Sequence, residues 1–192
     1  IEISQKALID NYCYLSSLNS EIKVAPVLKS NAYGCGLALV AKILDPLGTP
    51  FFCVDSLYEA YLLLRSGIKT PILIMGYIHP ESLNTKKLPF SYVVSTKEQI
   101  RAIKKYQPYA GIHVFVDTGM HREGIGLEEL PDFIKEIKLV DLKLEGLMSH
   151  FGMSEKVKNK LTKLQVSKFA NAQKIAKDMG FTPKWIHIAN SS

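Results

Sequence analysis

Seven short apolar runs, mostly separated by helical patterns, constrain the fold of this chain more than any other feature of its sequence. We expect these runs to form strands at residues 24–28, 51–54, 71–75, 92–94, 112–116, 142–148 and 185–189. We expect helices at residues 4–18, 37–47, 56–67, 96–106, 127–138 and 159–179, with a short one after Pro80. Continuous apolar runs are typical of strands buried on both faces, and alternation with helices is typical of crossover connections. The pattern therefore predicts an α/β fold with a parallel sheet.

The number of strand-and-helix units favours closure of this sheet into a (βα)8 TIM-type barrel. An open doubly wound sheet is the alternative, although no GxGxxG motif follows the first predicted strand. The eighth unit of a barrel is missing from the sequence, and an unpaired barrel edge would promote aggregation. We therefore expect residues 1–192 to be most of an N-terminal barrel domain, truncated after strand seven.

Composition excludes several classes of protein. At 47% hydrophobic and 22% charged residues, the chain resembles an ordinary soluble globular protein. The net charge of +6 comes mainly from dispersed lysines, whereas nucleic-acid binding calls for a compact basic patch. Cys13, Cys35 and Cys53 show no CxxC pairing, which argues against a disulfide framework or a zinc site and fits a reducing cytosol.

The sequence shows neither a membrane span nor a signal peptide, so we expect a cytoplasmic protein without a membrane partner. The chain begins at Ile1 rather than Met, which leaves open a leader that has been lost.

Residues that carry chemistry gather at the predicted C-terminal ends of the strands, where the active sites of α/β sheets and barrels lie. They follow the first, fifth, sixth and seventh predicted strands, and they are Lys29, Tyr33, Arg122, His150, Asn190, Ser191 and Ser192.

A partly desolvated lysine forms Schiff bases, and an arginine held between glycines presents a fixed fork to an anion or phenolate oxygen. Hydroxyl and N–H groups at a helix N-terminus hold phosphate, which TIM barrels often bind after strands seven and eight. An imidazole can stack on a flat ligand. Together these groups indicate a site for a phosphorylated aromatic aldehyde, namely pyridoxal phosphate.

Each of these residues also has a structural interpretation. Lys29 could extend its amine into solvent from a strand end, and His150 could be a satisfied core residue. Arg122 could pair with Asp117 or Glu123, and Tyr33 could be a packed aromatic. Residues 190–192 could cap the next helix. Cys35 is either a small residue in a tight turn or a reactive thiol.

The segment KSNAYGCG (29–36) closely resembles the cofactor-lysine signature of the alanine racemases, which are fold-type III pyridoxal-phosphate enzymes. The segment VDTGM (116–120) with Arg122, residues 146–151, and Asn190 with Ser191 recur in the order typical of that family. The likeness covers essentially the whole chain. It implies an isomerase that interconverts L- and D-alanine, supplies D-alanine for peptidoglycan and acts as a cytoplasmic homodimer.

The resemblance also implies a role for each residue. Lys29 carries the cofactor as an aldimine and is the base on one face of the substrate. Arg122 contacts the phenolic oxygen of the cofactor and the carboxylate side of the substrate, and His150 stacks on the pyridine ring. The phosphate is bound by Tyr33 and Ser191 and supported by Asn190.

In this family the second base is a tyrosine from the C-terminal β-domain of the partner subunit, and an arginine faces the pyridine nitrogen. Neither lies within these 192 residues, so the resemblance implies that this fragment alone is poorly active or inactive.

Two departures from the family pattern lie near the substrate side. Phe115 stands where many alanine racemases have a lysine that orients the arginine of the next loop, and phenylalanine cannot do this. The loop reads MHREG, with His121 and Glu123 around Arg122, where MGRLG is usual. The preferred substrate, whether alanine, serine or a broader set, stays open.

Two rival functions share the fold. One is a pyridoxal-phosphate-binding homeostasis protein, a single barrel that holds the cofactor without known turnover. The other is a fold-type III decarboxylase or aldolase, for which the sequence shows no distinguishing motif. The NAYG segment and the DTGM-x-R loop fit the racemases better than the homeostasis proteins.

Overall fold

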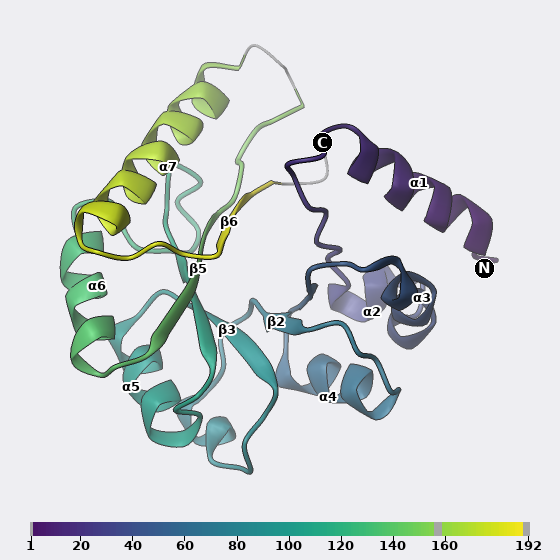
Figure 1. Cartoon of the computed structure of the whole chain (residues 1–192), viewed down its shortest axis with the longest axis horizontal. Helices are drawn as coiled ribbons and strands as arrows, with labels where there is room; N and C mark the ends of the chain where they lie inside the picture. Colours follow the sequence, from purple (N-terminus) through teal and green to yellow (C-terminus); the bar gives the residue numbers. More distant parts are fainter. Residues whose placement is uncertain (1, 156–158, 190–192) are drawn as a thin grey trace. The chain divides into compact units, whose positions relative to one another are not determined.

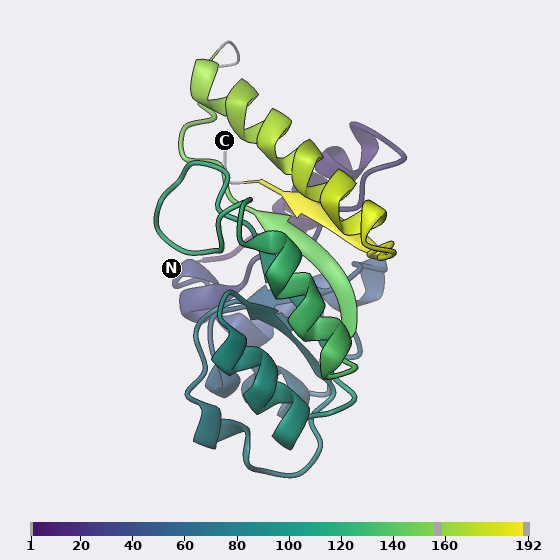
Figure 2. The ribbon, with the colours of Figure 1, turned by 90° about the vertical axis from the view of Figure 1, so that its left-hand side faces the viewer.

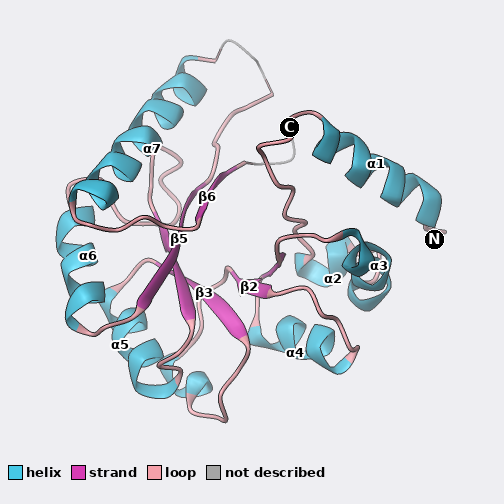
Figure 3. Ribbon diagram, viewed as in Figure 1, coloured by secondary structure: helices cyan, strands magenta, loops and turns pink. Residues whose placement is uncertain are grey.

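The computed structural model describes residues 2–155 and 159–189. The chain divides into two compact units, one made of residues 1–78 and 89–91 and the other of residues 79–88 and 92–192. The boundary between them falls within β3 (Phe90–Val94). Both units combine helices with parallel strands, as the sequence predicts (Figures 1 and 3).

The first unit begins with helix α1, whose start is fixed by Ser4: its hydroxyl accepts a hydrogen bond from the N–H of Ala7. The elements of this unit are α1 (Gln5–Ser17), α2 (Lys29–Tyr33), α3 (Leu37–Leu44), η1 (Asp45–Leu47), β1 (Phe52–Val54), α4 (Leu57–Arg65) and β2 (Ile72–Ile74). Strands β1 and β2 pair in parallel and every residue in them is buried. Ser56, the first residue of the helix expected at 56–67, caps α4.

The prediction of a first strand at residues 24–28, buried on both faces, is wrong. Val27 makes only an isolated parallel bridge to Cys53, and it is 38% exposed. The physical reason is Pro26, which has no N–H to donate to a sheet; only its carbonyl is paired, with the N–H of Cys53 at 2.9 Å. Lys29 therefore begins α2 instead of ending a strand.

The second unit is a parallel sheet with helices along one face. Its elements are η2 (Pro80–Leu83), most of β3, α5 (Lys97–Tyr106), β4 (Gly111–Phe115), α6 (Leu130–Leu139), β5 (Lys143–Ser149), α7 (Lys160–Asp178) and β6 (Trp185–Ile188). Strands β3 to β6 pair in parallel in chain order. Helices α5, α6 and α7 lie side by side against these strands (Figure 2).

Local sequence signals set the ends of these helices. Thr96 and Gln99 form a reciprocal capping box at the start of α5, and Asn159 caps α7. Helix α6 begins at Leu130, three residues after the expected start at Leu127, with a proline in its first turn. Residue 150 follows the end of β5 directly, so His150 lies at the C-terminal end of a strand as predicted.

The described part of the chain holds neither a helix suited to span a membrane nor a cluster of side chains suited to a metal ion. None of its helices combines the length and apolar character needed to cross a membrane. No cluster of three or more histidine, cysteine or acidic side chains suited to a metal ion occurs in residues 2–155 and 159–189.

Candidate functional site

The backbone after Lys29 forms a left-handed helical turn. Ser30, Asn31, Ala32 and Tyr33 all have φ between 53° and 56°. Residues with a Cβ adopt this conformation at a cost of about 1–2 kcal/mol each, so a run of them persists only where its surroundings enforce it. Backbone strain of this kind clusters at active sites and ligand clamps.

Glu59 and Asn31 hold this turn in place. The Glu59 carboxylate accepts the N–H of Asn31 at 3.1 Å with one oxygen and the N–H of Asp55 at 2.9 Å with the other. The Asn31 side-chain oxygen accepts the N–H of Leu37 at 2.8 Å and so fixes the start of α3. The turn is thereby tied to α3, α4 and the end of β1.

Of the two predicted site residues in the first unit, Lys29 directly precedes this turn and Tyr33 is its last residue. Lys29 is half-buried and Tyr33 is 63% exposed, so Tyr33 is not the packed aromatic of the structural interpretation. Neither side chain has a hydrogen bond or ion pair to another described residue. An open pocket of about 350 Å³ lies beside the turn, lined in part by Ser30, Asn31 and Glu59.

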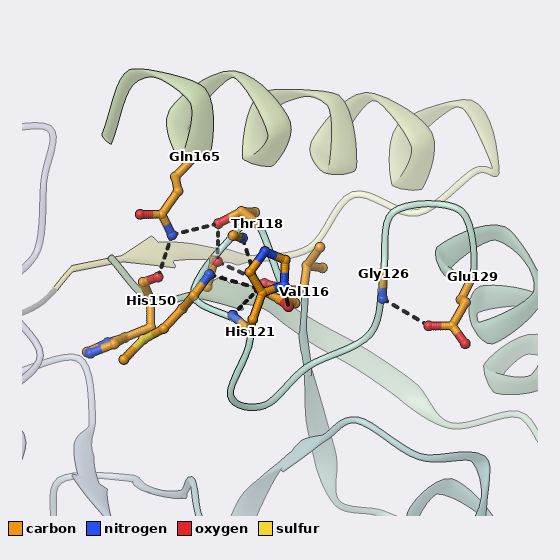
Figure 4. Close-up of polar contacts among 11 residues, drawn as sticks. Val116, Thr118, His121, Gly126, Glu129, His150 and Gln165 are labelled. Carbon is orange, nitrogen blue, oxygen red and sulfur yellow. Dashed lines mark hydrogen bonds and ion pairs between the residues drawn. The ribbon is translucent and has the colours of Figure 1, made fainter. Parts of the chain in front are cut away.

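In the second unit, Asp117 organises the loop that follows β4. Its Oδ1 accepts the N–H groups of Gly119, Met120 and His121 at 2.9–3.1 Å, and its Oδ2 lies 3.1 Å from the His121 ring (Figure 4). Burial raises the pKa of Asp117, but these N–H groups and the His121 ring outweigh it and lower the pKa below its usual value. The loop is therefore built around an ionised carboxylate.

A parallel bridge between Val116 and Ile125 closes the same loop at its base. Gly124, with φ of +104°, lies so close to this bridge that an added Cβ would approach the Asp117 nitrogen to 2.8 Å and the Phe115 ring to 3.1 Å. Phe115 thus packs under the loop that carries Arg122, whose guanidinium lies 3.8 Å from Glu123. This exposed pair agrees with the structural interpretation of Arg122, whereas Asp117 pairs with His121 instead.

Buried hydroxyl groups connect this loop to the end of β5. The Ser149 hydroxyl donates to the Val116 carbonyl at 2.8 Å and lies 2.8 Å from the Thr118 hydroxyl. Gln165 of α7 joins the same network through Thr118 and through the backbone of residues 150 and 152 (Figure 4). The carbonyl of His150 faces Gln165, and its imidazole ring points away from α7 (Figure 4).

A buried histidine, His113 of β4, forms a hydrogen-bonded pair with a half-buried one, His187 of β6. Nδ1 of His113 lies 2.8 Å from Nε2 of His187, and Nε2 of His113 lies 4.0 Å from a Glu145 oxygen. Burial and the neighbouring His187 lower the pKa of His113 to about 3, although Glu145 acts in the opposite direction. Burial lowers the pKa of His187 to about 4. Both rings are neutral at pH 7, so one donates and the other accepts.

The predicted site residues are thus distributed over both units. Lys29 and Tyr33 belong to the first unit and Arg122 and His150 to the second. Asn190, Ser191 and Ser192 lie outside the described residues. Their roles stay predictions.

Sequence patterns do not indicate the residues that support this site. Glu59 and Gln165 are single polar residues on helices, indistinguishable in the sequence from solvated ones, and Thr118 and Ser149 are small residues beside recognised motifs. The only available signal was that Thr118 lies within the DTGM segment.

A family described as "Alanine racemase, N-terminal domain" matches residues 3–192 of the chain. The chain belongs to this alanine racemase family. The alanine racemase of Citrifermentans bemidjiense is 36% identical over 205 residues, which cover 100% of the chain and 54% of that protein. An amino-acid racemase of Enterococcus faecalis is 33% identical over 196 residues, which cover 99% of the chain and 28% of that protein.

The fold agrees with this family. The alanine racemase of Clostridium difficile 630, solved in complex with cycloserine, matches with a TM-score of 0.88 at 27% identity, over 97% of the chain and 53% of that structure. This likeness is consistent with the α/β barrel domain expected for alanine racemases. The chain spans about half the length of these alanine racemases.

Proposed function

We propose that the complete protein is a pyridoxal-phosphate-dependent alanine racemase, with Lys29 as the cofactor lysine. The observation that carries this proposal is the KSNAYGCG segment, which places Lys29 directly before an enforced left-handed turn in a chain of the alanine racemase family. Relatives named alanine racemase at 33–36% identity support the same activity.

The residues of the first unit fit the aldehyde and phosphate of this cofactor. Pyridoxal phosphate, when bound, supplies an electron sink for charge that develops at the α-carbon of an amino acid. The half-buried Lys29 amine makes no hydrogen bond or ion pair within the described segments, so it is available to hold the cofactor aldehyde. In the proposal, Lys29 also moves the proton at one face of the substrate α-carbon, and the exposed Tyr33 hydroxyl binds phosphate with Ser191.

The second unit supplies the groups for the ring of the cofactor. Arg122 carries a permanent positive charge on a loop held by Asp117 and is assigned to the phenolic oxygen and the substrate carboxylate. His150 follows β5, with its ring directed away from α7, and is assigned to stack on the pyridine. Asn190 is assigned to support the phosphate.

The proposal extends to the whole protein. Residues 1–192 would form most of an N-terminal barrel domain, followed by a C-terminal β-domain. A tyrosine from the partner subunit of a homodimer would be the second base, so the 192 residues alone would racemise poorly or not at all. The activity would supply D-alanine for peptidoglycan in the cytoplasm.

A broader amino-acid racemase is the second candidate. The Enterococcus faecalis relative at 33% identity is named an amino-acid racemase. His121 and Glu123, on either side of Arg122, are both exposed and add charge and hydrogen-bonding groups to a loop assigned to the substrate carboxylate. A substrate larger or more polar than alanine would meet these side chains.

The test is the visible absorption spectrum of the complete protein with pyridoxal phosphate, compared with Lys29→Ala. Lys23→Ala is the matched control, because Lys23 is a nearby lysine with an exposed side chain. We expect a yellow band in the wild type and in Lys23→Ala, and none in Lys29→Ala. We also expect the wild type to exchange the α-hydrogen of L-alanine in heavy water.

The alternative outcomes separate the candidates. If the band is present and serine or another amino acid exchanges its α-hydrogen while alanine does not, that amino acid is the substrate instead of alanine. A band with no exchange of any amino acid would favour the cofactor-binding homeostasis protein. A spectrum that does not depend on Lys29 would refute the proposal.

A further inference from the structure

The side chain of Gln165 is fully buried, and both the nitrogen and the oxygen of its amide form hydrogen bonds. Its Nε2 donates to the Thr118 hydroxyl at 3.2 Å and to the His150 carbonyl at 2.8 Å. Its Oε1 accepts the N–H of Gly152 at 3.0 Å. One glutamine on α7 therefore bonds both the loop after β4 and the turn after β5 (Figure 4).

The direction of each bond in this network follows from its donors. Ser149 uses its single hydroxyl hydrogen on the Val116 carbonyl, so its oxygen accepts from Thr118. Thr118 therefore uses its own hydrogen on Ser149 and must accept from Gln165. The chain of donors runs from Gln165 through Thr118 and Ser149 to Val116, and only a side chain with a hydrogen-bond donor at position 165 can start it.

We propose that Gln165 is a positioning residue of the racemase site, which holds the His150 backbone and the Arg122 loop at a fixed separation. This inference rests on the proposed function, in which His150 and Arg122 contact the cofactor. The Gln165 bonds use the backbone of residue 150 and leave the imidazole directed away from α7. Thr118 lies next to Asp117, the carboxylate that folds the loop around its backbone N–H groups.

Gln165→Glu is the discriminating variant. Glutamate has nearly the same shape but, when ionised, accepts hydrogen bonds only, so it cannot donate to Thr118 or to the His150 carbonyl. Gln173→Glu is the matched control, because it makes the same change at an exposed position of the same helix. Gln165→Met provides a second variant, which removes the hydrogen bonds without adding a buried charge if Gln165→Glu fails to fold.

The first measurement is amide hydrogen exchange in the complete protein without cofactor. We expect Gln165→Glu or Gln165→Met to raise exchange at residues 117–124 and 150–153, with no change in Gln173→Glu. Unchanged exchange at these segments would overturn the inference, whether or not the protein is a racemase.

The second measurement is steady-state racemisation of L-alanine by the folded, cofactor-loaded enzyme. A displacement of about 1 Å in a catalytic group can cost roughly 100-fold in rate, so we expect a lower kcat by roughly 10- to 100-fold with KM nearly unchanged. We also expect Gln165→Met to have little further effect once His150→Ala is present. Full activity in Gln165→Met, or fully additive effects with His150→Ala, would overturn the positioning role.

The two measurements distinguish failure of the inference from failure of the proposed function. A wild-type protein that neither binds pyridoxal phosphate nor racemises an amino acid would refute the proposed function, and with it the role of Gln165 in racemisation. The exchange measurement would still decide whether Gln165 holds the two segments.

Discussion

Gly146 on β5 is a position where a single added methyl group should be strongly destabilising. A Cβ there would lie 2.4 Å from Nδ1 of His113 and 2.7 Å from its Cγ and Cε1. Ordinary contacts begin at 3.4 Å, so the ring would have to move by about 1 Å. His113 is only 1% exposed and its Nδ1 is bonded to His187 at 2.8 Å, so a shift of this size would break the bond.

The expected loss of stability has two parts. Overpacking a filled interior costs about 1–3 kcal/mol. Leaving a buried polar nitrogen without its hydrogen bond costs about 1–3 kcal/mol. We therefore expect Gly146→Ala to lower the free energy of unfolding by about 2–6 kcal/mol.

The assay is urea unfolding of the complete protein at pH 8, followed by far-UV circular dichroism. Gly152→Ala is the control, because a Cβ there would meet nothing closer than 3.6 Å and should change stability little. His113→Ala makes room for the new methyl group, so Gly146→Ala should cost much less in that background. An equal cost of Gly146→Ala with and without the His113 ring would refute the reasoning.

Three further predictions concern pH and local structure. His113 and His187 have pKa values of about 3 and about 4 in the folded protein, below the ordinary 6.5, so the unfolded chain binds these protons first. The free energy of unfolding should therefore fall as the pH drops from about 6.5 towards 4, by up to about 1.4 kcal/mol per pH unit for each ring. A urea midpoint that stays constant over this pH range would contradict this. Asp117→Ala should leave three backbone N–H donors without their carboxylate acceptor, cost about 1–3 kcal/mol and raise hydrogen exchange at residues 119–121, while the exposed Asp178→Ala should do neither. Thr96→Ala should lose the capping box of α5 and about 1 kcal/mol in urea unfolding, whereas the exposed Thr182→Ala should cost almost nothing.

The sequence predicted most of the elements because their signals are local. Ser4, Ser56, Thr96 and Asn159 are the first residues of four expected helix ranges, and each caps the helix that follows it. The later apolar runs form parallel strands because each is long enough and has no proline within the pairing segment, although the last of them, β6, is only partly buried. The run at residues 24–28 looked equally apolar, and Pro26 prevented it from pairing as a strand.

The candidate site was predictable where its chemistry is concentrated in a motif. The KSNAYGCG and VDTGM segments predict the alanine racemase family, which the comparison confirms. They also single out Lys29, Tyr33 and the nearby Arg122 as candidates, whose roles stay predictions. The conformation of the first segment was not predictable, because a left-handed run of residues with a Cβ opposes local preference and depends on Glu59, 28 residues away from the Asn31 N–H that it binds.

The sequence by itself determined the alternation of strands and helices, the family and the residues that carry the proposed chemistry. These follow from side-chain identity, hydrophobic pattern and capping, all of which act over a few residues. Only the tertiary structure decided which polar residues support that chemistry, since a buried Gln165 and an exposed Gln173 on the same helix differ only in what packs against them. Hydrogen bonds between distant segments depend on how deeply a side chain is buried and on where its donors and acceptors point. Neither property follows from the residue type at a single position of the chain.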